Sequence, residues 1–247
     1  MIAHQVEAIV LRTWPIHEAD QIVSLFTRDF GKVKGVAKAA ARSRRRFGGA
    51  MEPMTHVRAN YAEKPRQEMV RLDSFDIVTS PLSAPIDYAR AAALAFYAEV
   101  LEETLPDHDP HDAVFRLLVA VLSYTRNDCI WMPVTYFALW TTRLMGWLPE
   151  LSVCVQCGTP LNKQPAYFQQ SADGLFCSQH RRSGSSTLSV ESQALAARIL
   201  RVSVPALSAE AWPRQRGADL RRFAIQALER HIDRRLTSAI ALNRLGA

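Results

Sequence analysis

The sequence predicts an α+β protein, in which a small five-stranded β-barrel precedes an all-helical domain that carries a small cysteine-rich insert. Three observations lead to this fold class. Residues 1–80 read as short alternating strands, residues 81–247 show mainly helical spacing of apolar side chains, and a polar segment at about 152–182 interrupts the helices. With 247 residues and 48% hydrophobic content, the chain has enough apolar side chains to build a sizeable core.

The first 80 residues contain five short stretches with the two-residue period of β-strands. In QVEAIVLRTW, the side chains of Val6, Ala8, Val10 and Thr13 fall on one face. QIVSLFTRD and GKVKGVAK follow, with Gly31 between them as a turn, and THVRANYAEKPRQEMVRLDSFDIV supplies two more strands. Five strands in about 80 residues match the OB-fold, the five-stranded Greek-key barrel. We therefore expect an OB-fold domain over residues 1–80.

After SPLSAP the pattern becomes helical, which predicts a second domain over residues 81–247. IDYARAAALAFYAEVLEETL has a helical apolar stripe, and DPHDAVFRLLVAVLSYTRN offers Asp109 as N-cap with Pro110 at the first helical position. A third helix is expected in PVTYFALWTTRLMGWLP. Helix resumes from about Ser189, and GADLRRFAIQALERHIDRRL gives a last amphipathic helix.

Positive charge is concentrated at the two ends of the chain. The formal net charge is +6, but residues 1–80 carry 13 basic and nine acidic side chains, residues 81–150 carry four and nine, and residues 181–247 carry 12 and five. Such asymmetry suggests a polyanionic partner such as nucleic acid or a membrane surface, although many of these cations could simply be solvated. All 12 basic residues of the last block are arginines, which favour planar contact with phosphate or carboxylate.

The densest basic run is KVKGVAKAAARSRRRFGGAMEP, which we expect to form a loop and strand of the barrel. The predicted DNA-binding residues are its seven cations: Lys32, Lys34, Lys38, Arg42, Arg44, Arg45 and Arg46. Nothing nearby is suited to reading base edges, so binding should follow phosphates and tolerate any sequence. Phe47, Trp14 and Tyr61 could each stack on a base or pack in the barrel core.

The cysteine-rich insert has the spacing C-x2-C-x19-C-x2-H, formed by Cys154, Cys157, Cys177 and His180. Two such knuckles can offer four ligands to one tetrahedral ion, and a closed set of four is typical of structural zinc. A metal-free remnant and a redox or catalytic use are the alternatives. Cys129 lies far from the knuckles in sequence and reads as a small buried hydrophobe.

Several classes of protein are disfavoured by motifs that the sequence lacks. It has no G-x-x-x-x-G-K-[ST], G-x-S-x-G or H-E-x-x-H motif, so we expect no enzyme. It also has no run of about 18 apolar residues and no secretory signal at its N-terminus, so we expect a cytoplasmic protein without membrane contact.

Taken in order along the chain, these features resemble the RecO family of bacterial recombination mediators. The resemblance rests on the opening EAIVLRTWPIHEADQIVSLFTRDFGKVKGVAKAA, the arginine-rich step into RFGGAMEPM, and a helical region interrupted by CVQCG and a second knuckle. Cys154, Cys157 and Cys177 match the family's zinc cysteines, while His180 stands where many relatives have a fourth cysteine. The seven cations match the DNA-binding side of its OB domain.

What this resemblance implies is a mediator of DNA repair and recombination in the RecF pathway. Such a protein would bind single- and double-stranded DNA, anneal complementary strands, associate with RecR and the acidic tail of the single-stranded-DNA-binding protein SSB, and promote RecA loading, and it would be nucleoid-associated. From the residues alone, an OB-fold and zinc-knuckle RNA-binding or ribosome-associated protein is the alternative. A zinc enzyme acting on nucleic acid is a second rival.

Overall fold

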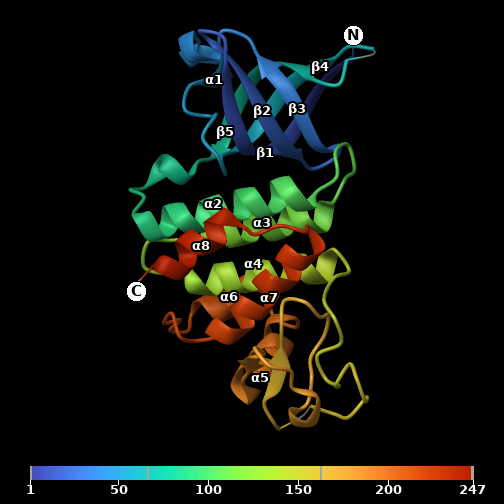
Figure 1. Ribbon diagram of the computed structural model, residues 1–247. Helices are drawn as coiled ribbons and strands as arrows, with labels where there is room; N and C mark the ends of the chain where they lie inside the picture. Colours follow the sequence, from blue (N-terminus) through green and yellow to red (C-terminus); the bar gives the residue numbers. More distant parts are fainter. Residues whose placement is uncertain (1, 66, 162, 246–247) are drawn as a thin grey trace. The chain divides into compact units, whose positions relative to one another are not determined.

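A computed structural model describes residues 2–65, 67–161 and 163–245. The chain divides into two compact units, residues 1–122 with 240–247 and residues 123–239, and each is described by itself. Figure 1 shows strands β1 to β5 in the N-terminal part of the chain and mainly helices after them.

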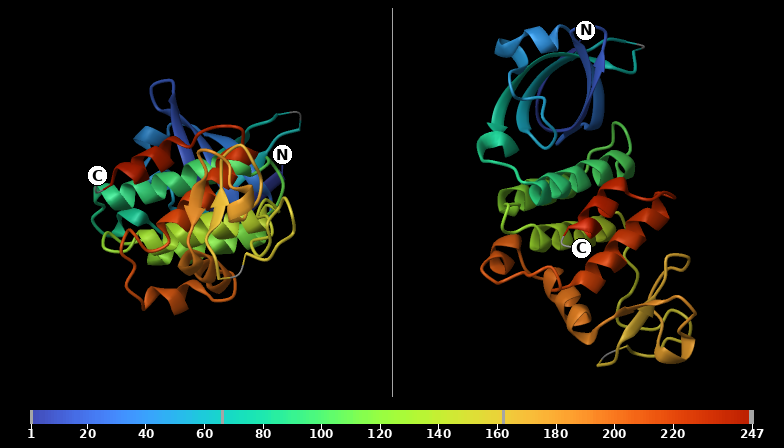
Figure 2. Two further views of the ribbon diagram at one scale, coloured as in Figure 1. Left: turned by 60° about the horizontal axis from the view of Figure 1, so that its bottom comes forward. Right: turned by 60° about the vertical axis from the view of Figure 1, so that its left-hand side comes forward.

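The first five strands form a closed barrel, which confirms the predicted α+β class and its OB-like domain. The strands are β1 (Ile2–Ile16), β2 (Asp20–Thr27), β3 (Gly31–Ala37), β4 (His56–Glu63) and β5 (Val70–Thr79). They close in the order β1-β2-β3-β5-β4, in which only β3 and β5 pair in parallel. The right view of Figure 2 shows the strands curving into a ring.

The barrel core follows the alternation read from the sequence. Val6, Ala8 and Val10 of β1 lie in one apolar cluster with the inward side chains of the other strands. The register of β1 against β2 shifts between Val10 and Arg12, so Leu11 is an extra residue of a β-bulge. This bulge places Thr13 opposite Val23, a core residue.

Lys32 and Lys34 of the basic run lie on β3, where a strand was predicted, but between β3 and β4 the run folds into two short helical turns and not into an open loop. These are the 3₁₀ turn η1 (Ala40–Arg42) and helix α1 (Arg44–Phe47). Phe47 is buried in the barrel and packs edge-on against Phe75, with ring centroids 5.3 Å apart. This apolar anchor explains why the chain turns inward here.

Two helices of the same unit follow the barrel, η2 (Pro81–Ser83) leading to α2 (Tyr88–Thr104) and then α3 (Asp112–Tyr124). The predicted start of α3 at Pro110 is wrong, since the helix begins at Asp112. The backbone of Asp109 lies so close to Gly31 that a Cβ on Gly31 would come within 2.2 Å of the Asp109 carbonyl oxygen. Residues before Asp112 therefore pack against the β2–β3 turn instead of extending the helix.

The second unit is built from α4 (Trp131–Leu144), α5 (Val190–Ile199), α6 (Val204–Ser208) and α7 (Ala218–His231), and α8 (Thr237–Arg244) runs across the boundary between the units. The cysteine-rich insert adds β6 (Ala166–Phe168), η3 (Ser178–His180) and β7 (Ser186–Leu188). β6 and β7 form a two-stranded antiparallel sheet. Among the helices of the described residues, none has both the length and the apolar character needed to cross a bilayer.

Candidate nucleic-acid interface and metal centre

The basic turns η1 and α1 lie beside the tip of the β1–β2 hairpin. The backbone N–H of Ala39 donates to Oδ1 of Asp20 at 2.7 Å, and that of Ala41 donates to the carbonyl of Ala19 at 3.1 Å. Figure 1 shows α1 at one rim of the barrel. The run is thus held in a defined place on the barrel and is not a loose loop.

Five of the seven predicted DNA-binding residues gather at this rim. We call them the rim group: Lys38, Arg42, Arg44, Arg45 and Arg46. All except the part-buried Arg46 are exposed. Arg42 forms an ion pair with Glu18 at 3.3 Å, while Arg44 and Arg45 have no carboxylate partner among the described residues. Most of the rim group's positive charge is therefore uncompensated.

Arg46 links the rim group to the barrel core. Its Nη2 donates to the carbonyl of Lys38 at 2.6 Å and its Nε to Oγ of Ser43 at 3.0 Å, while its guanidinium lies 5.0 Å from the ring centroid of Phe47. These contacts leave its charge unneutralised because none of the acceptors is a carboxylate. They fix the spacing of its neighbours, which lowers the entropy lost when a ligand binds.

Lys32 and Lys34 occupy a different place, on β3 beside the end of α2. The Nζ of the buried Lys32 donates to the carbonyl of Glu102 at 2.7 Å and lies 3.4 Å from Oδ1 of Asp107. Lys34 pairs with Glu102 at 3.8 Å and with Asp107 at 4.0 Å. The structure does not bring these two lysines together with the rim group.

Glu102 and Asp107 were missed as contact residues because the sequence offers capping and solvation as sufficient explanations. One signal was present. A carboxylate in the last turn of a helix faces the negative end of the helix dipole, which is unfavourable unless a cation compensates it. The carboxylate of Glu102 has one such partner, Lys34 at 3.8 Å, and Oγ of Ser24 also donates to it at 2.7 Å.

The knuckle residues Cys154, Cys157, Cys177 and His180 come together as predicted. Their ligand atoms all lie within 4.8 Å of one another. Nδ1 of His180 lies 3.3 Å from Sγ of Cys177, and Sγ of Cys157 lies 3.9 Å from Sγ of Cys177. Around an ion with metal–sulfur bonds of about 2.3 Å, tetrahedral ligands stand about 3.8 Å apart. The cluster therefore fits one tetrahedral metal ion.

Local backbone groups prepare Cys154 to act as a ligand. Burial opposes ionisation of its thiol, but backbone N–H groups of Cys177, Cys157 and Gln156 favour the thiolate and hold its pKa at about 6. Gly158 has a φ of +69° and donates its N–H to the carbonyl of Cys154 at 2.8 Å, which closes the first knuckle. A thiolate is the form that binds a metal ion.

The knuckle module contacts α7 through the last residue of β6 and through the loop that follows β6. Phe168 is buried and packs edge-on against Phe223, with ring centroids 5.2 Å apart. Arg230 donates to the carbonyl of Ala172 at 3.1 Å and pairs with Asp173. These contacts make the module a structural extension of the second unit.

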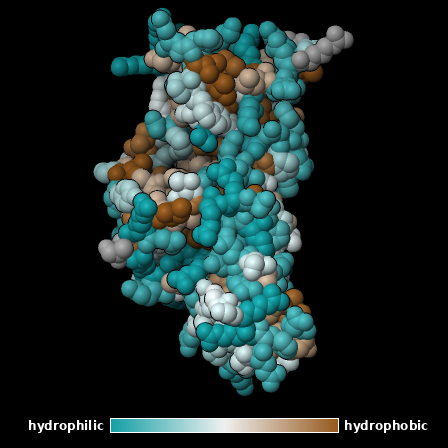
Figure 3. All heavy atoms as spheres, in the orientation of Figure 1, coloured by the Kyte–Doolittle hydropathy of each residue, from teal (hydrophilic) through white to brown (hydrophobic). Residues whose placement is uncertain are grey.

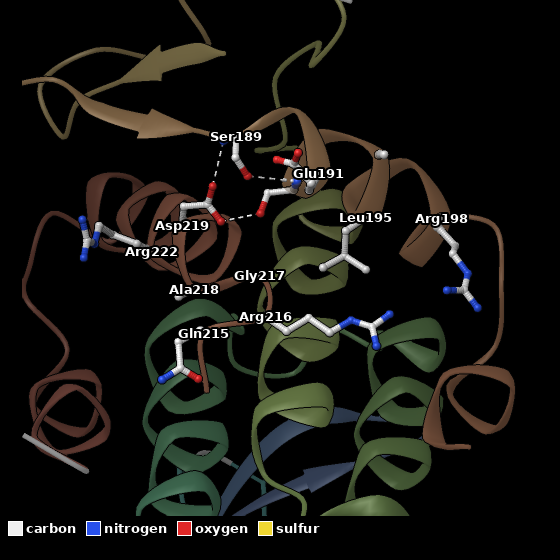
Figure 4. Close-up of a pocket in the computed structure, with 12 residues that line it drawn as sticks. Ser189, Glu191, Leu195, Arg198, Gln215, Arg216, Gly217, Ala218, Asp219 and Arg222 are labelled. Atoms are coloured by element: carbon white, nitrogen blue, oxygen red, sulfur yellow. Dashed lines mark hydrogen bonds between the residues drawn. The ribbon is translucent and has the colours of Figure 1, made fainter. Parts of the chain in front are cut away.

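A cavity of about 700 Å³ lies between α5 and the start of α7 (Figure 4). Three arginines line it, but Arg198 and Arg216 both pair with Glu210. At its other end, Asp219 accepts the backbone N–H of Ser189 at 2.7 Å and also a hydrogen bond from the hydroxyl of Ser192. The positive charge of the arginines that line this cavity is therefore largely neutralised by carboxylates of the same protein.

A second cavity of about 580 Å³ lies between residues 148–152 and α5. Its cations are Arg143, Lys163 and Arg201, all exposed and without an ion pair in the described part of the chain. The carboxylate of Glu150 accepts the backbone N–H of Ser152 at 3.0 Å. Apolar side chains complete the lining, among them Leu148, Leu151, Val190 and Leu200. We call this cavity the α5 groove.

Comparison with known proteins gives two family matches that together span almost the whole chain. Residues 1–81 match the family model "Recombination protein O N terminal", and residues 86–239 match "Recombination protein O C terminal". "DNA repair protein RecO" of Koribacter versatilis is 53% identical over 98% of both chains. The protein of the same name from Anaeromyxobacter sp. (strain K) is 33% identical, covering 96% of this chain and 95% of its own. The chain therefore belongs to the RecO family, which acts in DNA repair and recombination.

Proposed function

We propose that this protein is a non-enzymatic recombination mediator that binds single- and double-stranded DNA through the rim group and anneals complementary strands. The observation that carries the proposal is the gathering of five cations at one rim of an OB-like barrel, where Arg42 alone has a carboxylate partner within the described chain. In this proposal, Lys32 and Lys34 stabilise the packing of β3 against the end of α2, and the rim group binds the phosphates.

The chemistry of annealing requires charge neutralisation rather than bond making. Two complementary strands repel each other through their phosphates, and each contact with an arginine or lysine removes part of that repulsion. Because the rim group contacts phosphates and leaves base edges free, the complementary bases supply the recognition. This division suits a mediator that must act on any sequence.

An OB-fold and zinc-knuckle RNA-binding protein is the alternative that the residues alone allowed. Family membership favours DNA. The two are separated by competition between DNA and RNA strands of the same sequence, since an RNA-binding protein should depend on the 2′-hydroxyl and prefer RNA.

The partners proposed are RecR, the acidic SSB tail and, indirectly, RecA, in the RecF pathway. For the SSB tail, charge favours the α5 groove over the larger cavity. The larger cavity contains three arginines opposed by Glu191, Asp219 and the neighbouring Glu210, whereas the α5 groove has three cations against Glu150 alone. An acidic peptide that ends in a carboxylate needs both free cations and apolar contacts, which the α5 groove provides.

The cofactor proposed is one structural zinc ion held by Cys154, Cys157, Cys177 and His180. Four protein ligands leave no open position for water, so the ion would stabilise the knuckle module and would not act on a substrate. We place the protein in the cytoplasm, associated with the nucleoid.

The salt dependence of DNA binding tests the rim group. If each of its five cations contacts one phosphate of single-stranded DNA, log K should fall with log salt at a slope of about −3.5. Replacing Arg44, Arg45 and Arg46 with alanine should reduce the slope to about −1.4 and slow annealing. A matched variant with alanine at the exposed Arg116, Arg126 and Arg244 has the same net charge and should keep the original slope. Equal salt slopes for the two variants would show that the rim group does not contact the DNA phosphates.

The SSB tail is tested with a peptide of its last residues. Reversing charge at Arg143 and Arg201 should abolish binding, whereas Arg222→Glu in the larger cavity should leave it nearly unchanged. Loss of binding only in the Arg222→Glu protein would place the tail in the larger cavity instead.

A further inference from the structure

The outer face of β1, β2 and β3 is organised in rows that run across the strands. In one row Trp14 pairs with Ile22, Ile22 with Val36, and Val36 with Arg71 of β5. The residues that follow Ile22 and Val36 on their strands, Val23 and Ala37, belong to the barrel core. Because strand side chains alternate, this whole row points outward.

Two neighbouring outward rows are occupied by helices of the same unit. In the row farthest from Trp14, Phe26 packs against Phe115 of α3 with ring centroids 5.4 Å apart, and Lys32 is bonded to the end of α2. In the middle row, Ser24 and Lys34 both contact Glu102. The coverage of this face by α2 and α3 thus stops at the middle row.

The row led by Trp14 remains accessible. Trp14, Ile22 and Val36 are each only part-buried, although they carry large apolar side chains. Figure 3 shows brown, hydrophobic side chains gathered over the upper part of β2 and β3, bordered by hydrophilic and near-neutral ones. An apolar row on the outer face of a barrel is a surface that a ligand with an apolar face can cover.

Cations border this row, which decides the chemistry of the ligand. The guanidinium of Arg12 lies over Trp14, 5.0 Å from its ring centroid, and has no ion pair within the described chain. Arg71 ends the row on β5 and pairs with Asp73. On the other side, the β1–β2 hairpin that carries Trp14 is hydrogen-bonded to η1, within the rim group. Positive charge beside an aromatic face suits a strand of stacked bases with phosphates along its edge.

We propose that Trp14 stacks on a base of single-stranded nucleic acid that lies across the outer face of β1, β2 and β3, with Ile22 and Val36 beneath the neighbouring base. This inference rests on the proposed DNA-binding function and extends it. The rim group contacts phosphates of single and double strands alike, whereas Trp14 can reach only an unpaired base. The row thereby gives the barrel a preference for single strands.

Comparing the affinity for single-stranded and double-stranded DNA separates base stacking by Trp14 from phosphate contacts of the rim group. Trp14→Ala should weaken binding of a thymidine oligonucleotide about 10-fold, the usual effect of losing one aromatic–base stack. Its affinity for a duplex of equal length and its salt slope should stay unchanged. Trp14→Phe should retain most of the affinity. Tyr88→Ala, which removes another exposed aromatic of the same unit, should have no effect.

A probe altered in the DNA tests the same stack without relying on the fold of a variant. An oligonucleotide with abasic sites in place of its central bases should bind the unaltered protein about 10-fold more weakly than the intact strand, whereas Trp14→Ala, which keeps only the contacts of Ile22 and Val36, should show a much smaller difference. Equal binding of the two strands by the unaltered protein would overturn the proposal. Unchanged affinity of Trp14→Ala for single strands would also overturn it, whether or not the variant binds a protein partner less well.

The rim-group variants keep this test distinct from the proposed function. If alanine at Arg44, Arg45 and Arg46 leaves the salt slope of both strand types unchanged, DNA binding at the rim fails. If that variant behaves as expected and Trp14→Ala does not, only the stacking role fails.

Discussion

Lys32→Met tests whether Lys32 stabilises the fold or binds DNA, because methionine keeps the length of the buried stem and removes the ammonium. The structure allows the cost to be estimated. Nζ donates one charge-assisted hydrogen bond to the carbonyl of Glu102 at 2.7 Å, an interaction worth about 1.5–3 kcal/mol. Its pair with Asp107 adds little, since that carboxylate is about half exposed and can be rehydrated.

The expected loss of stability for Lys32→Met is therefore about 2 kcal/mol. For a chain of this size, that lowers the melting temperature by about 4–8 °C. Lys34→Met is the matched control, because the Lys34 side chain is 40% exposed and forms only long ion pairs with Glu102 and Asp107. Its cost should stay below about 1 kcal/mol.

Thermal denaturation and DNA titration on the same two variants complete the test. Lys32→Met should melt lower and keep the salt slope of DNA binding, measured well below its melting temperature. An unchanged melting temperature combined with a reduced slope would show that Lys32 contacts phosphate, and would refute the structural role derived from its contacts with α2.

Three further predictions follow from other parts of the molecule. The proposed zinc ion should be absent from Cys154→Ser and present in Cys129→Ser, measured by metal analysis of the purified proteins, and chelation should lower the melting temperature of the unaltered protein. Gly31→Ala should be costlier than Gly146→Ala in urea denaturation, because both glycines have positive φ but only Gly31 has a neighbouring backbone within 2.2 Å of the added Cβ; equal costs would mean that the contact with Asp109 is unimportant. Burial opposes ionisation of Asp219, yet hydrogen bonds from Ser189 and Ser192 hold its pKa below the ordinary 3.8, so the stability it contributes is present above that pH and is lost as pH falls through the lower value of the folded state. Asp219→Asn should accordingly flatten the acid limb of a stability profile between pH 5 and 2, and an unaltered limb would contradict this role.

The parts of the fold that sequence reasoning recovered are those set by local patterns. The barrel strands show the period of two, and the metal ligands lie in two short knuckles whose spacing alone brings four donors together. The start of α3 and the placement of Lys32 depend on contacts with residues far away in the sequence. Asp109 and Pro110 form a favourable helix start in isolation, but packing of Asp109 against Gly31 overrides it.

For the aromatic residues, the sequence left stacking and core packing open, and a single inserted residue decides between them for Trp14. Strict alternation after Val6, Ala8 and Val10 would direct Trp14 into the barrel, as it does Tyr61 on β4, which is buried. The extra residue Leu11 shifts the register by one, so Thr13 comes opposite Val23 while Trp14 comes opposite the outward Ile22. Because a slip of one residue moves every later side chain of a strand to the other face, the bulge places an aromatic ring outside the barrel beside the rim group. The bulge therefore determines which face of the barrel can offer both stacking and charge, and the helices α2 and α3 determine where that face ends.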